Sequence, residues 1–93
     1  LAGYFAFVIG GDEIARGKPD PEIYLTTIDM LKLNPKDCIV IEDSINGSLA
    51  GKNAGCYTIA VFSEYTKDQN FDFVDYFAKD LVDVKNHIER NFC

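Results

Sequence analysis

The sequence predicts an α/β fold, with a parallel sheet and helices packed against it. Two short apolar runs, residues 38–42 (CIVIE) and 57–62 (YTIAVF), have the pattern of strands that are buried on both faces. Helical patterns lie between these runs and after them. Strands that alternate with helices form right-handed crossover units, so the strands are expected to be parallel.

The first part of the chain is predicted to contain one strand and one helix. Residues 4–11 (YFAFVIGG) are aromatic and β-branched before two glycines, which favours a strand. The helix is expected to start with Asp20 as its N-cap and Pro21 at its first helical position. Residues 34–37 (NPKD) end it. Its predicted apolar face consists of Ile23, Tyr24, Thr27, Ile28 and Leu31.

The second part continues the alternation. Residues 43–55 are predicted to form a loop and a helix, with Gly55 as the C-terminal cap. A polar loop is expected at 63–70, and a weaker strand or extended segment at 71–77. Residues 79–93 are predicted to form an amphipathic helix. The apolar stripe of that helix consists of Leu81, Val84, Ile88 and Phe92.

Composition excludes some classes of function. The chain has 93 residues, enough for one small domain, and a net charge of −6 without a basic run, which argues against nucleic-acid binding. No apolar stretch is long enough to cross a bilayer, so no membrane partner is expected. Cys38, Cys56 and Cys93 form no CxxC pair, which favours buried core cysteines and a reducing, cytoplasmic compartment. The only methionine is Met30, so we expect a segment before Leu1.

Two adjacent carboxylates, Glu42 and Asp43, follow the apolar run 38–42. Sites in open α/β sheets lie at the carboxyl ends of strands, and carboxylate oxygens there suit Mg²⁺. Ser44 adds a hydroxyl, and the next helix N-terminus offers backbone donors for an anion. The competing interpretation is that Asp43 or Ser44 only caps the helix.

A second candidate residue is Lys18, in a turn held by Pro19 and Pro21. A cation fixed there could neutralise a phosphate and reduce repulsion between clustered carboxylates. The competing interpretation is a solvated lysine in a proline-rich turn. His87, the only histidine, is expected on the surface of the last helix.

Two segments in order, GKPDPEIY (17–24) and IVIEDSINGSLAGKNAG (39–55), together resemble the haloacid dehalogenase (HAD) superfamily. The likeness is greatest to its β-phosphoglucomutase-like phosphatases and mutases. It implies a magnesium-dependent hydrolase that acts on phosphorylated small molecules through an aspartyl-phosphate. The resemblance implies that Lys18 contacts the phosphoryl group. It implies that Asp43 binds Mg²⁺ directly and that Glu42 binds it directly or through water. Ser44 and Asn46 match polar positions in a supporting loop.

One part of the family pattern is missing. The family nucleophile belongs to a D-x-D-x-[TV] motif, and this chain has no Asp-x-Asp. The resemblance therefore implies that residues 1–93 are a single partial core domain, the C-terminal part of a Rossmann-like sheet that lacks the nucleophile strand and the cap. We expect this chain alone to be inactive.

The missing strands would also affect the sheet. In the family order, the nucleophile strand and the strand after it separate residues 5–9 from residues 38–42. The sheet would then either keep that order around a vacant centre, or re-pair within one chain or between two chains. Exposed strands would also allow self-association.

A second function class stays open. The chain could be a non-catalytic, magnesium-binding or regulatory α/β module, for which a response-regulator receiver domain is the nearest comparison. In receiver domains the acid pair precedes the lysine. Here Lys18 precedes Glu42 by 24 residues, which favours the hydrolase.

Overall fold

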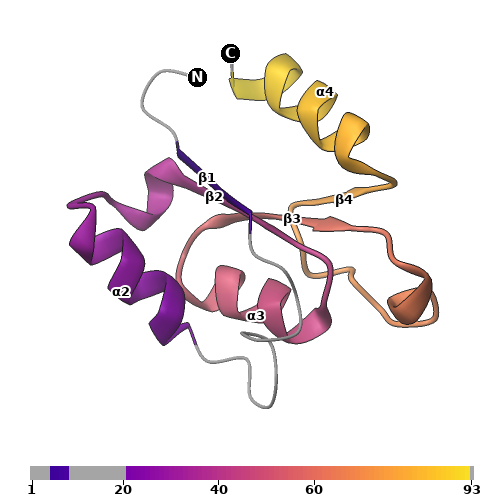
Figure 1. The fold of residues 1–93 in the computed structure, drawn as a ribbon, viewed down its shortest axis with the longest axis horizontal. Helices are drawn as coiled ribbons and strands as arrows, with labels where there is room; N and C mark the ends of the chain where they lie inside the picture. Colours follow the sequence, from indigo (N-terminus) through magenta and orange to yellow (C-terminus); the bar gives the residue numbers. More distant parts are fainter. Residues whose placement is uncertain (1–4, 9–20, 93) are drawn as a thin grey trace.

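The computed structural model describes residues 5–8 and 21–92, which form a parallel sheet between two layers of helices (Figure 1). Helices α2 and α3 cover one face of the sheet and α4 covers the other. The predicted α/β class is therefore confirmed. In chain order the elements are β1 (Phe5–Val8), α2 (Glu22–Met30), β2 (Cys38–Glu42), α3 (Ile45–Asn53), β3 (Tyr57–Val61), β4 (Tyr76–Ala78) and α4 (Leu81–Phe92), with short 3₁₀ turns at Pro35–Asp37 and Glu64–Thr66.

The strand order is β1-β2-β3-β4, and every neighbouring pair is parallel. β1 pairs directly with β2, from Phe5 opposite Cys38 to Val8 opposite Ile41. The vacant-centre alternative is therefore wrong, and the strands pair within one chain. Direct pairing satisfies backbone groups that a gap in the sheet would leave without partners.

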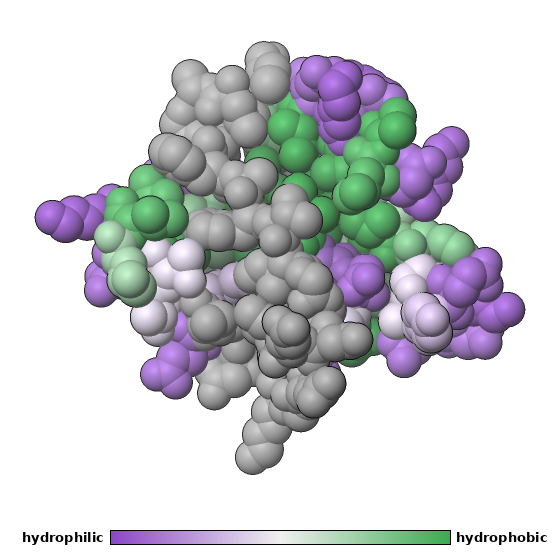
Figure 2. Space-filling model, viewed as in Figure 1, coloured by the Kyte–Doolittle hydropathy of each residue, from purple (hydrophilic) through white to green (hydrophobic). Residues whose placement is uncertain are grey.

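Every residue of β2 is buried, so the apolar run was correctly identified as a strand covered on both faces. Its side chains alternate between two separate cores, as strand geometry requires. The core under α2 and α3 contains Tyr24, Ile28, Cys38, Val40, Ala50, Ala54 and Cys56. The core under α4 contains Ile39, Ile41, Ile59, Ala78 and Val84. Figure 2 shows hydrophobic residues gathered where α4 meets the sheet, with hydrophilic residues over the outer side of that helix.

Helix α2 differs from the prediction at both ends. It begins at Glu22, and Pro21 precedes it with helical backbone angles, while Asp20 lies outside the described residues. Tyr24 and Ile28 are buried as expected, but Leu31 is 54% exposed. Leu31 is the C-cap of α2 and keeps helical backbone angles, so it lies at the end of the helix beyond the core that buries Tyr24 and Ile28. The Ile23 side chain lies outside the described residues.

Helices α2 and α3 end in the same way. Gly55 has a φ of 87°, and the N–H of Cys56 donates to the carbonyl of Gly51, so the predicted glycine cap is confirmed. At the end of α2 the same position is occupied by Lys32, with a φ of 57°. The N–H of Leu33 there donates to the carbonyl of Ile28 at 3.0 Å. The left-handed turn thus forms without a glycine, and Leu33 packs against the core behind it.

The segment 71–77 is only partly a strand. β4 covers Tyr76–Ala78, while residues 72–75 form a turn followed by a bend. Phe71, at the start of the predicted segment, lies outside the strand and is buried. The Asp75 carboxylate accepts the N–H of Thr58 at 2.7 Å and pairs with Lys52 at 3.0 Å, which holds the turn against the start of β3.

Helix α4 confirms most of the predicted stripe. Val84 is buried, and Ile88 and Phe92 pack against the same core, but Leu81 is 63% exposed. Leu81 is the first residue of α4 and lies three positions after the end of the three-residue edge strand. α4 spans 12 residues, and no helix within 5–8 and 21–92 has the length and apolar character needed to cross a membrane.

Candidate active site

Four of the five predicted site residues lie at the junction between β2 and α3. Because the sheet is parallel, this junction lies at the edge where the carboxyl ends of all the strands meet. Glu42 ends β2, Asp43 and Ser44 form the turn, and Asn46 lies in the first turn of α3. Lys18, the fifth, lies outside the described residues.

Glu42 is a buried carboxylate, with only 1% of its surface exposed. It follows Cys38 and Val40 on the face of β2 that α2 and α3 cover. Its Oε1 accepts the backbone N–H of Asp43 at 2.9 Å, and its Oε2 accepts the hydroxyl of Tyr24 at 3.3 Å. The side chain is thus held between its own strand end and helix α2.

Burial raises the pKa of Glu42 to about 7, and the neighbouring Asp43 carboxylate acts in the same direction. The backbone N–H groups of Asp43 and Ser44 oppose this shift by stabilising the charged form. Burial and then the negative charge of Glu42 raise the pKa of the Tyr24 hydroxyl, which keeps it a proton donor. Glu42 therefore changes charge near neutral pH, and a bound cation would favour its charged form.

Gly47 allows Glu42 to lie under α3. A Cβ added at Gly47 would overlap the Cγ, Cδ and Oε2 atoms of Glu42. The backbone of the first helical turn therefore packs directly against the carboxylate. This placement also brings a negative charge near the positive end of the helix dipole, which is favourable.

The side chain of Asp43 is exposed, in contrast to the buried side chain of Glu42. Asp43 follows the last residue of β2, and its carboxyl group is still close enough to Glu42 to raise the pKa of that residue. The Asp43 carbonyl accepts the Thr66 hydroxyl at 3.4 Å, which ties the turn to the loop after β3. Asp43 is the carboxylate in this turn that a solvent-borne ligand can reach.

Ser44 caps α3. Its Oγ accepts the N–H of Gly47 at 3.0 Å, so the capping interpretation is confirmed for Ser44. Its hydroxyl is thereby engaged with the helix. A shallow pocket of about 420 Å³ lies beside it, lined by Ser44, Ile45, Asn46, Thr66 and Gln69.

The donor set fits part of a magnesium site. Mg²⁺ is usually bound by one or two carboxylates, while waters and substrate phosphate oxygens complete its octahedron. Asp43 suits the role of a direct metal ligand, because its side chain is exposed. Glu42 suits a second, supporting position, because hydrogen bonds already orient both of its carboxylate oxygens. Within residues 5–8 and 21–92, no group of three or more His, Cys, Asp or Glu side chains is placed to hold a metal. A further protein ligand would have to come from outside these ranges.

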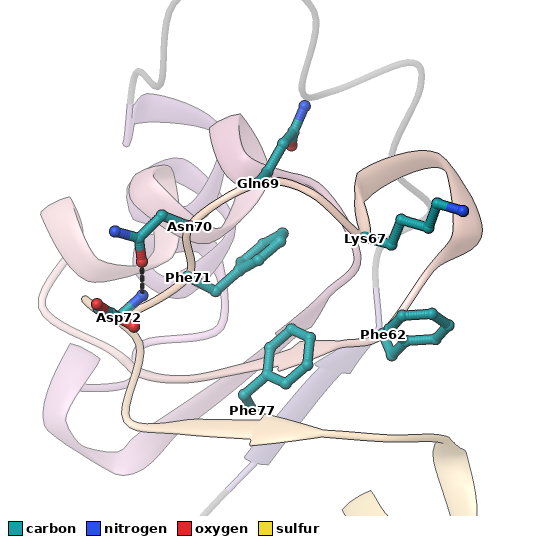
Figure 3. A pocket seen from close by; sticks show the side chains of 7 residues that line it. All are labelled: Phe62, Lys67, Gln69, Asn70, Phe71, Asp72 and Phe77. Carbon is teal, nitrogen blue, oxygen red and sulfur yellow. Dashed lines mark hydrogen bonds between the residues drawn. The ribbon is translucent and has the colours of Figure 1, made fainter.

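A second hollow, of about 450 Å³, lies at the ends of β3 and β4 (Figure 3). The rings of Phe71 and Phe77 lie 5.3 Å apart, while Lys67 and Gln69 extend away from them. Gln69 also lines the shallow pocket beside Ser44, so the two hollows are neighbours. The residues that line the larger hollow are Phe62, Lys67, Gln69, Asn70, Phe71, Asp72 and Phe77.

His87 departs from the prediction of a surface residue. Its ring is half-buried and stacks on the ring of Tyr76, with the two centroids 3.7 Å apart. The Nε2 atom of His87 lies 2.8 Å from the Tyr57 hydroxyl, within hydrogen-bond distance. Burial lowers its pKa. The cluster is on the α4 face, so it stabilises the docking of α4 and is not part of the turn after β2.

The sequence did not identify Tyr24 and Gly47 as neighbours of Glu42. Helical spacing placed Tyr24 on the inner face of α2, but it carries no information about which group its hydroxyl meets. A small residue three positions after Ser44 was the only local sign of a close approach. Both contacts depend on how the helices pack on β2.

Comparison with known proteins gives a family match. The model of the haloacid dehalogenase-like hydrolases matches residues 1–55. The bifunctional riboflavin kinase/FMN phosphatase of Arabidopsis thaliana is 41% identical over 81 residues, covering 87% of this chain and 21% of that protein. The protein CbbY of Rhodobacter capsulatus is 36% identical over 77 residues, covering 83% of this chain and 34% of that protein.

A solved structure gives the same result. The crystal structure of CbbY from Rhodobacter sphaeroides in complex with phosphate has a TM-score of 0.62 and 35% sequence identity. The match covers 71% of this chain and 29% of that one. This chain thus spans between about a fifth and a third of the length of these relatives.

Proposed function

The chain belongs to the haloacid dehalogenase-like hydrolases, and from this premise we propose that it is part of a phosphatase or phosphosugar mutase that requires Mg²⁺. In this proposal residues 1–93 are one partial core domain, the C-terminal part of a longer enzyme. The reaction transfers a phosphoryl group from a small phosphate monoester to an aspartate carboxylate upstream of Leu1. The alcohol of the ester leaves; in a phosphatase water then hydrolyses the aspartyl-phosphate to inorganic phosphate and the free carboxylate, whereas in a mutase the phosphoryl group passes to a sugar hydroxyl.

The observation that carries the proposal is the arrangement of the two carboxylates at the end of β2. Asp43 is exposed at the edge where sites of parallel sheets lie, and Glu42 is buried behind it with both oxygens hydrogen-bonded. A buried carboxylate is costly unless it is well paired, so its presence at this edge favours a functional role over a solvated surface.

Each residue then has a defined part. Asp43 binds Mg²⁺ directly, and Glu42 supports it directly or through a water. The bound Mg²⁺ supplies charge neutralisation at the phosphoryl oxygens. Lys18 contributes a second positive charge to the phosphoryl group and the nucleophile. Ser44 keeps α3 in position, and Asn46 lines the pocket at the N-terminus of that helix.

Phosphate monoesters are the substrate class that the comparisons favour. The Arabidopsis relative is named as an FMN phosphatase, and the CbbY crystal structure contains phosphate. Both concern proteins much longer than this chain. We therefore propose the class, small phosphorylated metabolites, without choosing one member.

The test is hydrolysis of p-nitrophenyl phosphate and of a panel of sugar phosphates, with and without Mg²⁺. The complete gene product and the 93-residue chain are compared side by side. We expect turnover by the complete product only, lost in EDTA and restored by Mg²⁺. Activity of the short chain would contradict the proposal, because the nucleophile would then lie within residues 1–93.

One observation favours a second candidate, a non-catalytic Mg²⁺-binding or regulatory module. β1 pairs directly with β2, so no space for a nucleophile strand lies between them. In the catalytic proposal that strand must enter between β1 and β2 in the complete enzyme. A complete product that binds Mg²⁺ but hydrolyses no phosphate ester would favour the module.

A further inference from the structure

Tyr24 joins helix α2 to the end of β2. Its side chain is 1% exposed, and its hydroxyl donates to Oε2 of Glu42 at 3.3 Å across a separation of 18 residues. Among the described residues, Tyr24 belongs to an apolar core cluster that also contains Ile28 and Val40. The group that its hydroxyl meets at the edge of this core is the Glu42 carboxylate.

The Glu42 carboxylate depends on such a partner. One of its oxygens is held by the Asp43 backbone, which belongs to the same turn. The other is held by Tyr24, which belongs to a different element. Without the hydroxyl, Oε2 would be a buried acceptor that has lost a donor, and the carboxylate would gain freedom to rotate.

Gly47 restricts the same carboxylate from a third element. The backbone of α3 packs so closely on the Glu42 side chain that no Cβ fits at Gly47. Contacts with α2, α3 and the strand end thus determine the orientation of Glu42 together. Among these contacts, only the one from Tyr24 can be removed by deleting a single oxygen atom.

We propose that Tyr24 is a positioning residue for the magnesium site: its hydroxyl orients the Glu42 carboxylate, and through Glu42 the pair with Asp43. This inference rests on the proposed function. Partners in the second layer around a metal ligand set the ligand's orientation, and losing one weakens metal binding about tenfold or more.

The experiment measures metal affinity and not turnover. Mn²⁺, which replaces Mg²⁺ at oxygen sites, is titrated into the complete gene product, and free Mn²⁺ is read by electron paramagnetic resonance. Tyr24→Phe removes only the hydroxyl. We expect it to raise the Kd for Mn²⁺ about tenfold, while the protein stays folded with a somewhat lower urea midpoint because Oε2 loses its donor. Tyr76→Phe is the matched control, since that tyrosine also donates to a carboxylate, Asp83 at 2.8 Å, but on the α4 face.

A double-mutant cycle separates positioning from packing. If Tyr24 acts through Glu42, Tyr24→Phe should have no further effect on the Kd in a Glu42→Gln background. An additive effect, or a wild-type Kd in Tyr24→Phe, overturns the positioning role while the metal site stands. A wild-type protein that binds no Mn²⁺ overturns the magnesium site itself, and with it this inference.

Discussion

Gly47→Ala gives a direct test of where Glu42 lies. The substitution adds one methyl group to the first turn of α3, and that methyl group would overlap the Glu42 side chain. Glu42 cannot move into solvent easily, because it is 1% exposed and enclosed by α2, α3 and the sheet. Either the carboxylate or the helix N-terminus must therefore shift.

The size of the effect follows from competing contributions. Forcing extra atoms into a filled core costs about 1–3 kcal/mol. Displacing Glu42 would also break hydrogen bonds from Tyr24 and Asp43, each worth about 1 kcal/mol. Alanine is a better helix former than glycine by about 1 kcal/mol, which offsets part of this loss. We expect the free energy of unfolding to fall by about 2–4 kcal/mol.

Urea denaturation followed by circular dichroism measures this change, and Ser48→Ala on the same helix is the control. The Ser48 hydroxyl is buried without a hydrogen-bond partner among the described residues. Ser48→Ala should therefore leave the free energy of unfolding unchanged or raise it by up to about 1 kcal/mol. The two substitutions lie one residue apart and should act in opposite directions.

A double mutant identifies the overlapping group. In a Glu42→Ala background the side chain beneath Gly47 is absent, so Gly47→Ala should no longer destabilise the protein. If Gly47→Ala costs the same in both backgrounds, the overlap is not with Glu42. If it costs nothing even in the wild type, the close packing of α3 on Glu42 is refuted.

Three further predictions concern the fold and the site. Lys32→Gly should raise the free energy of unfolding by roughly 0.5–1 kcal/mol, because Lys32 has a φ of 57°, and Lys32→Ala should not; equal urea midpoints would contradict this. In EDTA, the contribution of Glu42 to stability should be fully present below about pH 4.5 and be lost as the pH rises through its folded pKa of about 7. The free energy of unfolding should fall by roughly 3 kcal/mol over this range, since each pH unit between the unfolded and folded pKa values is worth about 1.4 kcal/mol. A Glu42→Gln variant with the same dependence of stability on pH would refute the assignment to Glu42. Asp43→Asn should lower Mg²⁺-dependent turnover of the complete gene product about 100-fold or more at an unchanged urea midpoint, and wild-type turnover would reject Asp43 as the metal ligand.

Local patterns were sufficient for the elements and their caps. The continuous apolar runs identified β2 and β3, because a strand covered on both faces needs no polar side. The position of Gly55 correctly marked the end of α3, because a left-handed residue there favours glycine. Adjacent carboxylates at the end of a predicted strand also indicated the turn after β2 as the candidate site, and that turn lies at the carboxyl end of the parallel sheet.

Side-chain environment was harder to predict. Leu31 and Leu81 satisfied the helical spacing but are exposed, because each lies at a helix end where no element packs on it closely enough to bury it. His87 was expected on the surface, yet it is half-buried where its ring packs against Tyr57 and Tyr76. These residues are separated by up to 30 positions in the chain, so no local pattern relates them.

The sequence by itself determined the alternation of strands and helices, the family, and the turn that contains Glu42 and Asp43. Only the tertiary structure decided that β1 lies directly beside β2, that Glu42 is buried against Tyr24 and Gly47, and that Asp43 is exposed. The physical reason is the range of the interactions. Helix caps and apolar runs depend on neighbours in the chain, whereas strand partners and the contacts of a buried carboxylate depend on residues that only folding brings together.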